Sequence, residues 1–168
     1  MFPDWNFRKY EHSNHMETFP KTFNDGYLLF TERWKITSKD FAPMKGLQDE
    51  ALEKEVKKLL ARKADQQRTE VPYSFREVQI IQRQAEMINE YQTAANISGL
   101  LVRLLETDAS LPKEDKEGIS QWLKEKQLYL NFRDICGLAQ SASDRKDYKL
   151  AAQEYSRAFD LNVIRGTY

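Results

Sequence analysis

The apolar residues after Pro43 recur at helical spacing almost to the end of the chain, and this pattern constrains the fold more than any other feature. Good helix formers dominate the stretch, and its apolar residues return every three or four positions. Such spacing places apolar side chains on one face of a helix. The pattern predicts four helices, which are Leu47–Arg68, Ser74–Glu106, Lys113–Ala142 and one that begins at Asp144 or Asp147.

The second of these helices is expected to be the central element. Ser74 and Glu77 have the spacing of a capping box, and a single helix from there to Glu106 would have about 33 residues and a length of about 50 Å. Its apolar residues form two neighbouring seams, as in a coiled coil, so it should contact partners on two sides. The third helix would fold back on it. We therefore predict a mainly α fold, a helical bundle built on a long antiparallel helical hairpin.

The first quarter of the chain has a different character. Residues 1–42 hold half of the aromatic side chains, and Met1–Asp25 follows neither the helical nor the strand period. The segment Tyr27–Thr37 fits a helix face and a strand equally well. We predict two parts, an irregular aromatic-rich N-terminal arm over residues 1–43 and a helical bundle over residues 44–168.

The net charge and the length of the longest apolar run limit the functions that this chain can have. Its 168 residues include 26 Lys and Arg against 26 Asp and Glu, so no global field attracts a polyanion. The longest strongly apolar run, Ile97–Leu105, is about half of the roughly 20 residues that cross a bilayer, and no export signal is visible. The single cysteine, Cys136, cannot form an internal disulfide. These features predict a cytoplasmic protein without a membrane segment.

Few residues suggest catalysis or a metal. The six glycines are isolated, so the sequence has no glycine-rich phosphate loop. His12 and His15 stand beside two glutamates, but a closed metal site needs about four ligands and the chain has no other histidine. Cys136 could act as a nucleophile with one of these histidines, yet it lies on an apolar helix face, where a free cysteine usually acts as a small hydrophobe. We predict no metal, no cofactor and no enzymatic activity.

A basic stretch in the first helix, Lys54–Arg68, is the one candidate for nucleic acid. Lys57, Lys58, Arg62 and Lys63 could contact phosphates there. Carboxylates stand just upstream, so pairing along the helix is the favoured interpretation. Any binding of nucleic acid should be weak and should disappear at moderate salt. A small helical regulator that contacts nucleic acid through this helix is the alternative function.

The last helix and the end of the one before it, about residues 135–162, resemble one helix pair of a tetratricopeptide repeat. Ala151, Tyr155 and Ala158 stand at that repeat's small, aromatic and small packing positions, and Leu138 and Ala139 stand where its first helix usually has Leu-Gly. The resemblance implies two closely packed antiparallel helices. Four positions depart from the repeat pattern, which are Ile135, Ala142, Lys146 and Val163.

A repeat array does not follow from this resemblance. One period of about 34 residues earlier, the packing positions fall on Glu117, Gln121 and Lys124, which cannot play these roles. A solenoid needs about three repeats to bury a continuous core. The pair is therefore expected to close the bundle, and the family's peptide groove is not expected here.

Two features predict a role in protein assembly. The aromatic arm carries rings such as Trp5, Phe7 and Tyr10, which are costly to leave in water. The run that contains Ile97, Leu101 and Leu105 is apolar around most of its helix and needs cover from several directions. We predict a non-enzymatic adaptor, scaffold or assembly subunit that binds a protein partner or forms a homo-oligomer through these residues.

Overall fold

The computed structural model describes residues 36–67, 70–107 and 112–165, with side chains as far as Leu161. The chain divides into two compact units, Met1–Lys35 and Ile36–Tyr168, and the described residues all belong to the second. The predicted partner residues Trp5, Phe7 and Tyr10 therefore lie outside the described part, as do His12, His15 and residues 27–35 of the ambiguous segment.

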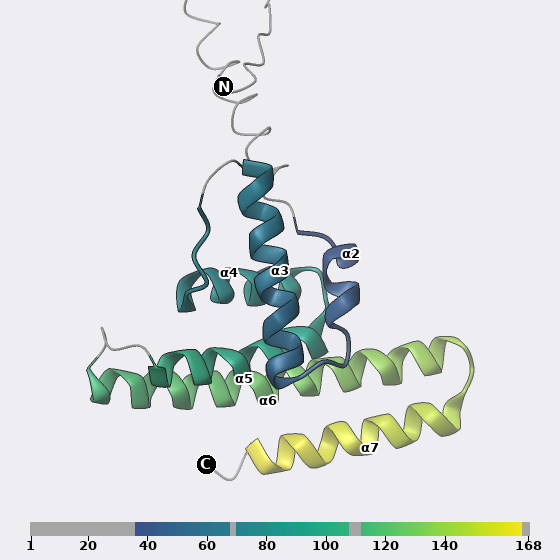
Figure 1. Ribbon diagram of the computed structural model, residues 1–168. Coiled ribbons are helices and arrows are strands. Elements are labelled where there is room, and N and C mark those ends of the chain that lie inside the picture. Colours follow the sequence, from purple (N-terminus) through teal and green to yellow (C-terminus); the bar gives the residue numbers. More distant parts are fainter. Residues whose placement is uncertain (1–35, 68–69, 108–111, 166–168) are drawn as a thin grey trace, which may run out of the picture. The chain divides into compact units, whose positions relative to one another are not determined.

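The described residues are almost entirely helical and contain no strand, so the prediction of a mainly α fold is confirmed (Figure 1). The elements, in chain order, are the short helix α2 (Ser38–Phe41), the 3-10 helix η1 (Ala42–Met44), α3 (Asp49–Gln67), α4 (Phe75–Met87), α5 (Tyr91–Thr107), α6 (Lys113–Asp144) and α7 (Tyr148–Arg165).

The prediction of a single helix over Ser74–Glu106 is wrong, because this segment forms two helices, α4 and α5. The N-cap is as expected, since the Ser74 hydroxyl accepts a hydrogen bond from the Glu77 N–H. However, α4 ends at Met87, and Asn89 takes the left-handed conformation, with φ of +64°. The Asn89 N–H donates to the Glu86 carbonyl and the Glu90 N–H donates to the Ala85 carbonyl, which is a Schellman motif. Asparagine tolerates this conformation better than most residues, so the chain turns here.

The corner between α6 and α7 repeats this geometry. Lys146 has φ of +63°, its N–H donates to the Ser143 carbonyl, and the Asp147 N–H donates to the Ala142 carbonyl. Asp147 then caps α7, because its carboxylate accepts a hydrogen bond from the Leu150 N–H at 3.1 Å. The predicted start of the last helix at Asp147 is confirmed. At the other end of α6, Pro112 is the N-cap residue.

The strained lysine at this corner gives a testable expectation. Glycine adopts a positive φ without the steric penalty that a Cβ atom brings, so Lys146→Gly should stabilise the protein by about 0.5–1 kcal/mol. A thermal melt would show a higher midpoint for this variant. Lys149→Gly is the matched control, because Lys149 lies inside α7, and it should lower the midpoint. A lower midpoint for Lys146→Gly would contradict the strain at this corner.

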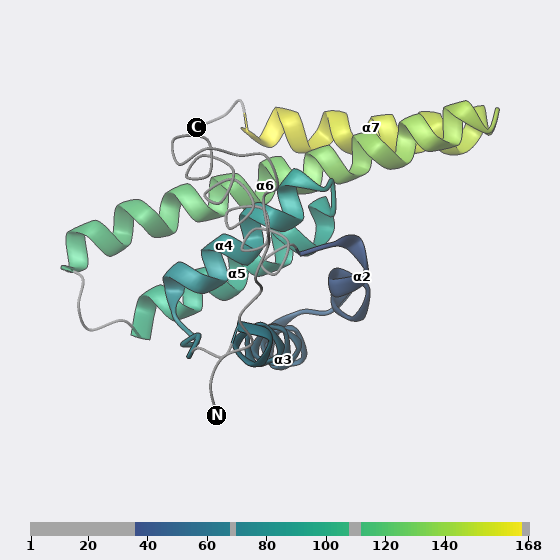
Figure 2. The same ribbon diagram turned by 90° about the horizontal axis from the view of Figure 1, so that it is seen from above.

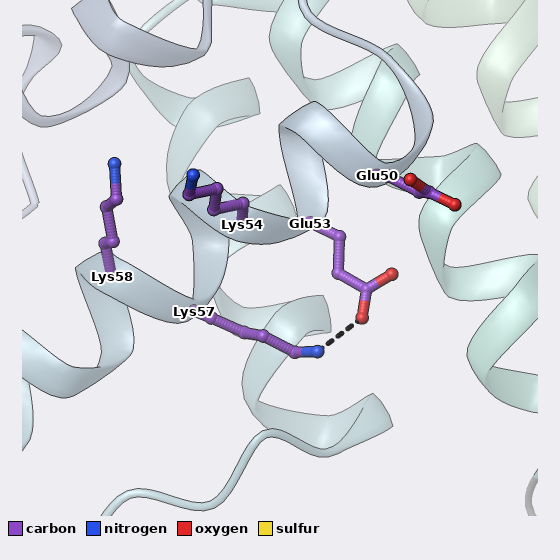
Figure 3. Close-up of a pocket in the computed structure, with 5 residues that line it drawn as sticks. All are labelled: Glu50, Glu53, Lys54, Lys57 and Lys58. Atoms are coloured by element: carbon purple, nitrogen blue, oxygen red, sulfur yellow. Dashed lines mark ion pairs between the residues drawn. The ribbon is translucent and has the colours of Figure 1, made fainter.

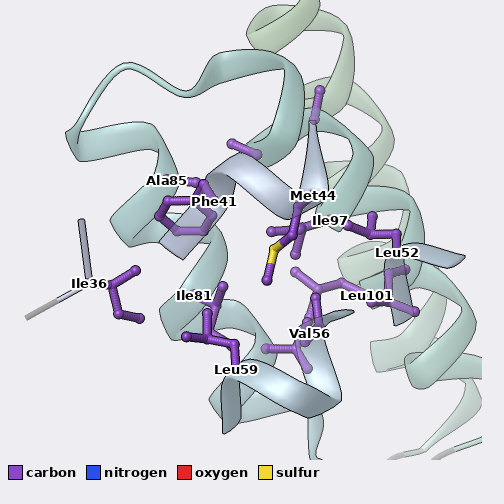
Figure 4. Packing of buried hydrophobic residues seen from close by; sticks show 14 of the residues in the cluster. Ile36, Phe41, Met44, Leu52, Val56, Leu59, Ile81, Ala85, Ile97 and Leu101 are labelled. Atoms are coloured by element: carbon purple, nitrogen blue, oxygen red, sulfur yellow. The ribbon is translucent and has the colours of Figure 1, made fainter. Parts of the chain in front are cut away.

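Helices α3, α4, α5 and α6 enclose the main core together with the α2–η1 segment, and Figure 4 shows the part of it between α2–η1, α3, α4 and α5. Met44 is buried in it, and so are Ile36 and Phe41, which precede Pro43. The buried pair Gln82 and Ser98 ties α4 to α5, since the Gln82 amide donates to the Ser98 hydroxyl at 2.8 Å. The α2 segment is also fastened to α3, because Arg62 forms an ion pair with Asp40 at 2.5 Å.

Helix α6 packs along α5 and then continues beyond it to pack along α7 (Figures 1 and 2). The single long hairpin that the sequence predicts is therefore replaced by two successive helix pairs that share α6. In both views α7 lies on the side of α6 away from α3. Helix α7 packs mainly on α6, so much of its surface is free of the described part of the chain.

Candidate partner-binding surface

A row of exposed aromatic side chains follows α7. Tyr148, Tyr155 and Phe159 are 67%, 46% and 68% exposed, and Ala152 between them is exposed as well. Their positions are separated by four, three and four residues, so they lie on one side of the helix. We call these four residues the α7 stripe. A solvent-exposed row of this kind, without a charged residue in it, is typical of a protein-binding surface.

The packing of α7 on α6 explains why the stripe faces outward. The residues that face α6 are small, since Ala151 and Ala158 are buried and meet a helix on which Ala139 and Ala142 are buried too. Small residues on both helices let the two backbones approach closely. The larger side chains of α7, Tyr148, Tyr155 and Phe159, therefore lie beside the α6–α7 contact and not within it. The Tyr155 hydroxyl reaches across to α6 and donates to the Gln140 amide oxygen at 3.3 Å, which orients its ring.

The other side of the α6–α7 pair is polar and close to α5. Asp134 of α6 lies near Glu154 and Arg157 of α7, and its carboxylate accepts a hydrogen bond from the Gln92 N–H near the start of α5. Burial is the main cause that raises the pKa of Asp134, and the charges of Glu90 and Glu154 add to it. Leu138 lies one turn further on the same side as Asp134 and is 52% exposed. The α7 stripe therefore occupies one side of the helix pair, and Leu138 occupies the other.

The raised pKa of Asp134 predicts how stability depends on pH. A carboxyl whose pKa is higher in the folded state than in the unfolded chain destabilises the fold at neutral pH, and this cost disappears as the pH falls through the folded pKa. Asp134→Asn keeps an acceptor for the Gln92 N–H and removes the charge. We expect the variant to melt at a higher temperature than the wild type at pH 7, with a smaller difference at acidic pH. A lower melting temperature at pH 7 would contradict this account.

The sequence-predicted residues Ile97, Leu101 and Leu105 do not form a partner surface. All three are fully or almost fully buried by the chain's own helices, and Ile97 and Leu101 belong to the main core. A partner can contact only exposed side chains. The apolar character of this run reflects its place in α5, which packs on α3, α4 and α6 and so needs apolar residues on several sides.

The basic stretch lies on α3 beside an open depression of about 580 Å³ (Figure 3). Three lysines and two glutamates line this depression, which are Glu50, Glu53, Lys54, Lys57 and Lys58. Lys57 forms an ion pair with Glu53 at 2.6 Å and lies 4.5 Å from the centre of the Tyr73 ring. The Lys57 ammonium lowers the pKa of Glu53, and burial together with the Glu53 charge raises the pKa of Tyr73 to about 12.

Three of the four basic residues predicted for nucleic acid form ion pairs within the chain, although their side chains are exposed. Lys58 pairs with Glu55 at 2.6 Å and Arg62 pairs with Asp40. Lys63 is buried. The structure brings these residues onto one helix, but it also places a carboxylate beside Lys57, Lys58 and Arg62. The pairs of Lys57 and Lys58 agree with the interpretation that the charges stabilise their own helix, whereas Arg62 ties α3 to α2.

A second group of aromatic residues lies along α6. Aromatic and basic residues alternate there at helical spacing, in the order Trp122, Lys126, Tyr129 and Arg133. Lys126 pairs with Glu86 at 2.6 Å, and Arg133 donates to the hydroxyls of Tyr129 and Tyr91 at 2.9 and 2.7 Å. These contacts fasten the α4–α5 corner to α6. A shallow depression of about 230 Å³ lies beside them.

Cys136 is half-buried on α6, which agrees with its predicted place in a helix. Among the residues that the structure describes, no three or more His, Cys, Asp or Glu side chains are grouped to hold a metal ion. No helix in the described ranges is long and apolar enough to span a membrane.

Sequence reasoning missed the α7 stripe, although it found the residues. The sequence pattern of the last helix predicts a single apolar face, formed by Tyr148, Ala151, Ala152, Tyr155, Ala158 and Phe159. The structure divides this face into a buried row of small residues and an exposed row of mainly aromatic ones. The width of this apolar face could have indicated the exposed stripe, because the face is wider than one neighbouring helix can cover.

Comparisons with protein families, curated proteins and solved structures find no match for this chain.

Proposed function

We propose that this protein is a non-enzymatic assembly subunit, an adaptor or scaffold that binds another protein chain through the α7 stripe. The observation that carries the proposal is the exposure of Tyr148, Tyr155 and Phe159 in one row. Tyrosine and phenylalanine are enriched at protein interfaces, and tyrosine is among the residues that often dominate the binding energy. Large rings in water are costly, so covering them with a partner is favourable.

The tyrosines at the two helix corners support this choice. Tyr91 and Tyr148 each follow an acidic residue and begin the helix after a Schellman turn. Tyr91 is used within the chain, since its hydroxyl donates to Asn89 at 2.6 Å and accepts from Arg133. Tyr148 stands at the equivalent position of the second corner and projects into solvent. A partner would give it the contacts that Tyr91 already has.

The remaining parts of the sequence hypothesis belong to this proposal. The resemblance of residues 135–162 to a tetratricopeptide helix pair agrees with a role in binding proteins, without the groove of a repeat array. The aromatic arm, with Trp5, Phe7 and Tyr10, would add to the contact with a partner. One cysteine in the whole chain agrees with work in the reducing cytoplasm.

The experiment compares the native mass of the assembled protein for three forms of the full chain. The wild type, Phe159→Ser and Leu138→Ser would each be expressed in the native host, and the size of the complex in a cell extract would be measured by sedimentation. We expect the wild type to sediment above its chain mass of 19.8 kDa and Phe159→Ser to sediment at that mass. Both residues are exposed, so both variants should stay folded.

Leu138→Ser is the matched control, because it removes an exposed apolar side chain from the other side of the helix pair. It should leave the complex intact. A wild-type chain that sediments at 19.8 kDa, or a complex that Phe159→Ser leaves unchanged, would contradict the proposed function.

A further inference from the structure

We propose that the corner between α6 and α7 is a hinge through which two copies of this chain exchange their α7 helices. In the closed chain, α7 runs back along the C-terminal half of α6 (Figures 1 and 2). In the exchanged dimer, the corner straightens, α6 and α7 form one continuous helix, and each α7 packs on α6 of the other copy. This exchange uses the buried face of α7, so it goes beyond the proposed function of the exposed stripe.

The corner is short and holds one strained residue. Only Arg145, Lys146 and Asp147 separate α6 from α7, and all three are exposed. Lys146 has φ of +63°, a conformation that a residue with a Cβ atom adopts only at a steric cost. This cost disappears when the corner straightens into an α-helix. Short connections under strain favour the exchange of the element that follows them.

The sequence of the corner is compatible with a continuous helix. Residues 143–149 contain neither glycine nor proline. In the closed corner, the N–H groups of Lys146 and Asp147 donate to two carbonyls of the last turn of α6. In a continuous helix both groups bond to the same two carbonyls with the partners interchanged. The N–H groups of Tyr148 and Lys149, in the first turn of α7, then gain carbonyls four residues earlier as acceptors.

The contact between α6 and α7 passes from one copy to the other unchanged. It is made by small buried residues, which are Ala139 and Ala142 of α6 and Ala151 and Ala158 of α7. These surfaces are identical in every copy, so α7 of a second copy makes the same contacts in the same place. Helix α7 packs mainly on α6, so opening the corner breaks few other contacts with the described part of the chain.

The α4–α5 corner has the same backbone geometry but is not a hinge of this kind. Its left-handed residue is Asn89, which tolerates a positive φ at a lower cost than lysine. The Tyr91 hydroxyl donates to Asn89, and Lys45 pairs with Glu90 at 3.1 Å, so this corner is fastened from both sides. Helices α4 and α5 also carry much of the main core, which opening this corner would expose.

Refolding the full chain at a series of concentrations tests the exchange. Two chains must meet, so we expect the dimer after refolding from denaturant at about 1 mM and the closed chain after refolding in dilute solution. Light scattering should give 19.8 kDa for the closed chain and twice this mass for the dimer. Lys146→Gly relieves the strain at both corners of the pair, so it should raise the Kd of the dimer about 30-fold. Lys149→Gly weakens a helix in both forms and should leave the Kd unchanged.

A thiol crosslink identifies which chain holds each α7. The Tyr155 hydroxyl lies 3.3 Å from the Gln140 amide oxygen, so cysteines at these two positions are within reach of a short bismaleimide. The form tested carries Gln140→Cys and Tyr155→Cys, with Cys136→Ser to remove the native thiol. The closed chain should be linked within itself. In a continuous helix the two positions of one chain are about 22 Å apart, so the exchanged dimer should be linked between chains and run as a covalent dimer in denaturing electrophoresis.

Three results would overturn this inference. One is a wild-type chain that stays at 19.8 kDa after refolding at about 1 mM. Another is a dimer whose Kd is unchanged in Lys146→Gly. The third is a dimer whose chains carry only internal links, which is a contact between closed chains. Circular dichroism confirms that each variant is helical.

The exchange and the proposed function are tested separately. Phe159→Ser changes neither the corner nor the buried face of α7, so it should form the exchanged dimer at the same concentrations as the wild type. This result is expected whether or not the variant keeps its complex in the cell extract. A failure of the exchange likewise leaves the α7 stripe exposed on the closed chain.

Discussion

Replacing Phe41 by alanine is expected to lower the free energy of unfolding by about 3–5 kcal/mol, the usual cost of removing a buried aromatic ring. Phe41 is fully buried and packs in the main core with residues of α3, α4 and α5 (Figure 4). The loss would be a large part of the 5–15 kcal/mol that stabilises a typical domain. Chemical denaturation of the full chain, followed by circular dichroism, measures it.

Phe159→Ala is the matched control for Phe41→Ala. It removes the same ring from an exposed site, so its effect on the unfolding free energy of the monomer should stay within about 0.5 kcal/mol. Equal and small losses for the two variants would mean that α2 is not part of the core. The residues before Pro43 would then not be part of the helical unit.

Leu101→Ala should destabilise the protein by about 2–5 kcal/mol, because it removes the buried Cγ, Cδ1 and Cδ2 atoms from the centre of α5 and leaves a cavity. Leu101 is fully buried between helices. The stability loss should come without a specific loss of association at concentrations and temperatures where the variant is folded. Leu138→Ala provides the comparison, since Leu138 is exposed and its removal should cost little.

The outcome for Leu101 also separates core from interface. The sequence makes this residue a candidate for partner binding, whereas the structure buries it in the chain's own core. A Leu101→Ala variant that melts like the wild type but loses its association with a partner would contradict the structural assignment.

Much of the fold follows from helical spacing. The bounds of α3 and α6 lie within two residues of those predicted, and the caps at Ser74 and Asp147 act as expected. These elements were predictable because local signals agree there, with good helix formers, a capping residue and a regular apolar row at the same place. The α4–α5 corner was not predictable, because its sequence, Ile88-Asn89-Glu90, contains neither the glycine nor the proline that usually marks a break in a helix.

The candidate surface was harder to predict than the fold. Apolar spacing identifies which residues share a helix face, but it does not say which neighbour covers that face. Ile97 and Leu101 are covered by α3, α4 and α6, whereas in the described part of the chain Tyr155 and Phe159 lie beside the narrow contact with α6 and stay exposed. Which face is covered depends on tertiary packing between distant segments. For the same reason, the sequence predicts the pairs that Lys57 and Lys58 form within α3 but not the pair between Arg62 and the distant Asp40.

The most direct test of a binding surface on α7 is site-specific photocrosslinking in the native host. A photoreactive phenylalanine analogue would replace Tyr155 in one form of the full chain and Gln153 in another. These residues lie on different sides of α7, so only the first should face a partner. The account predicts a covalent adduct of one defined mass from position 155 and none from position 153. No adduct from position 155, or equal adducts from both positions, would contradict it.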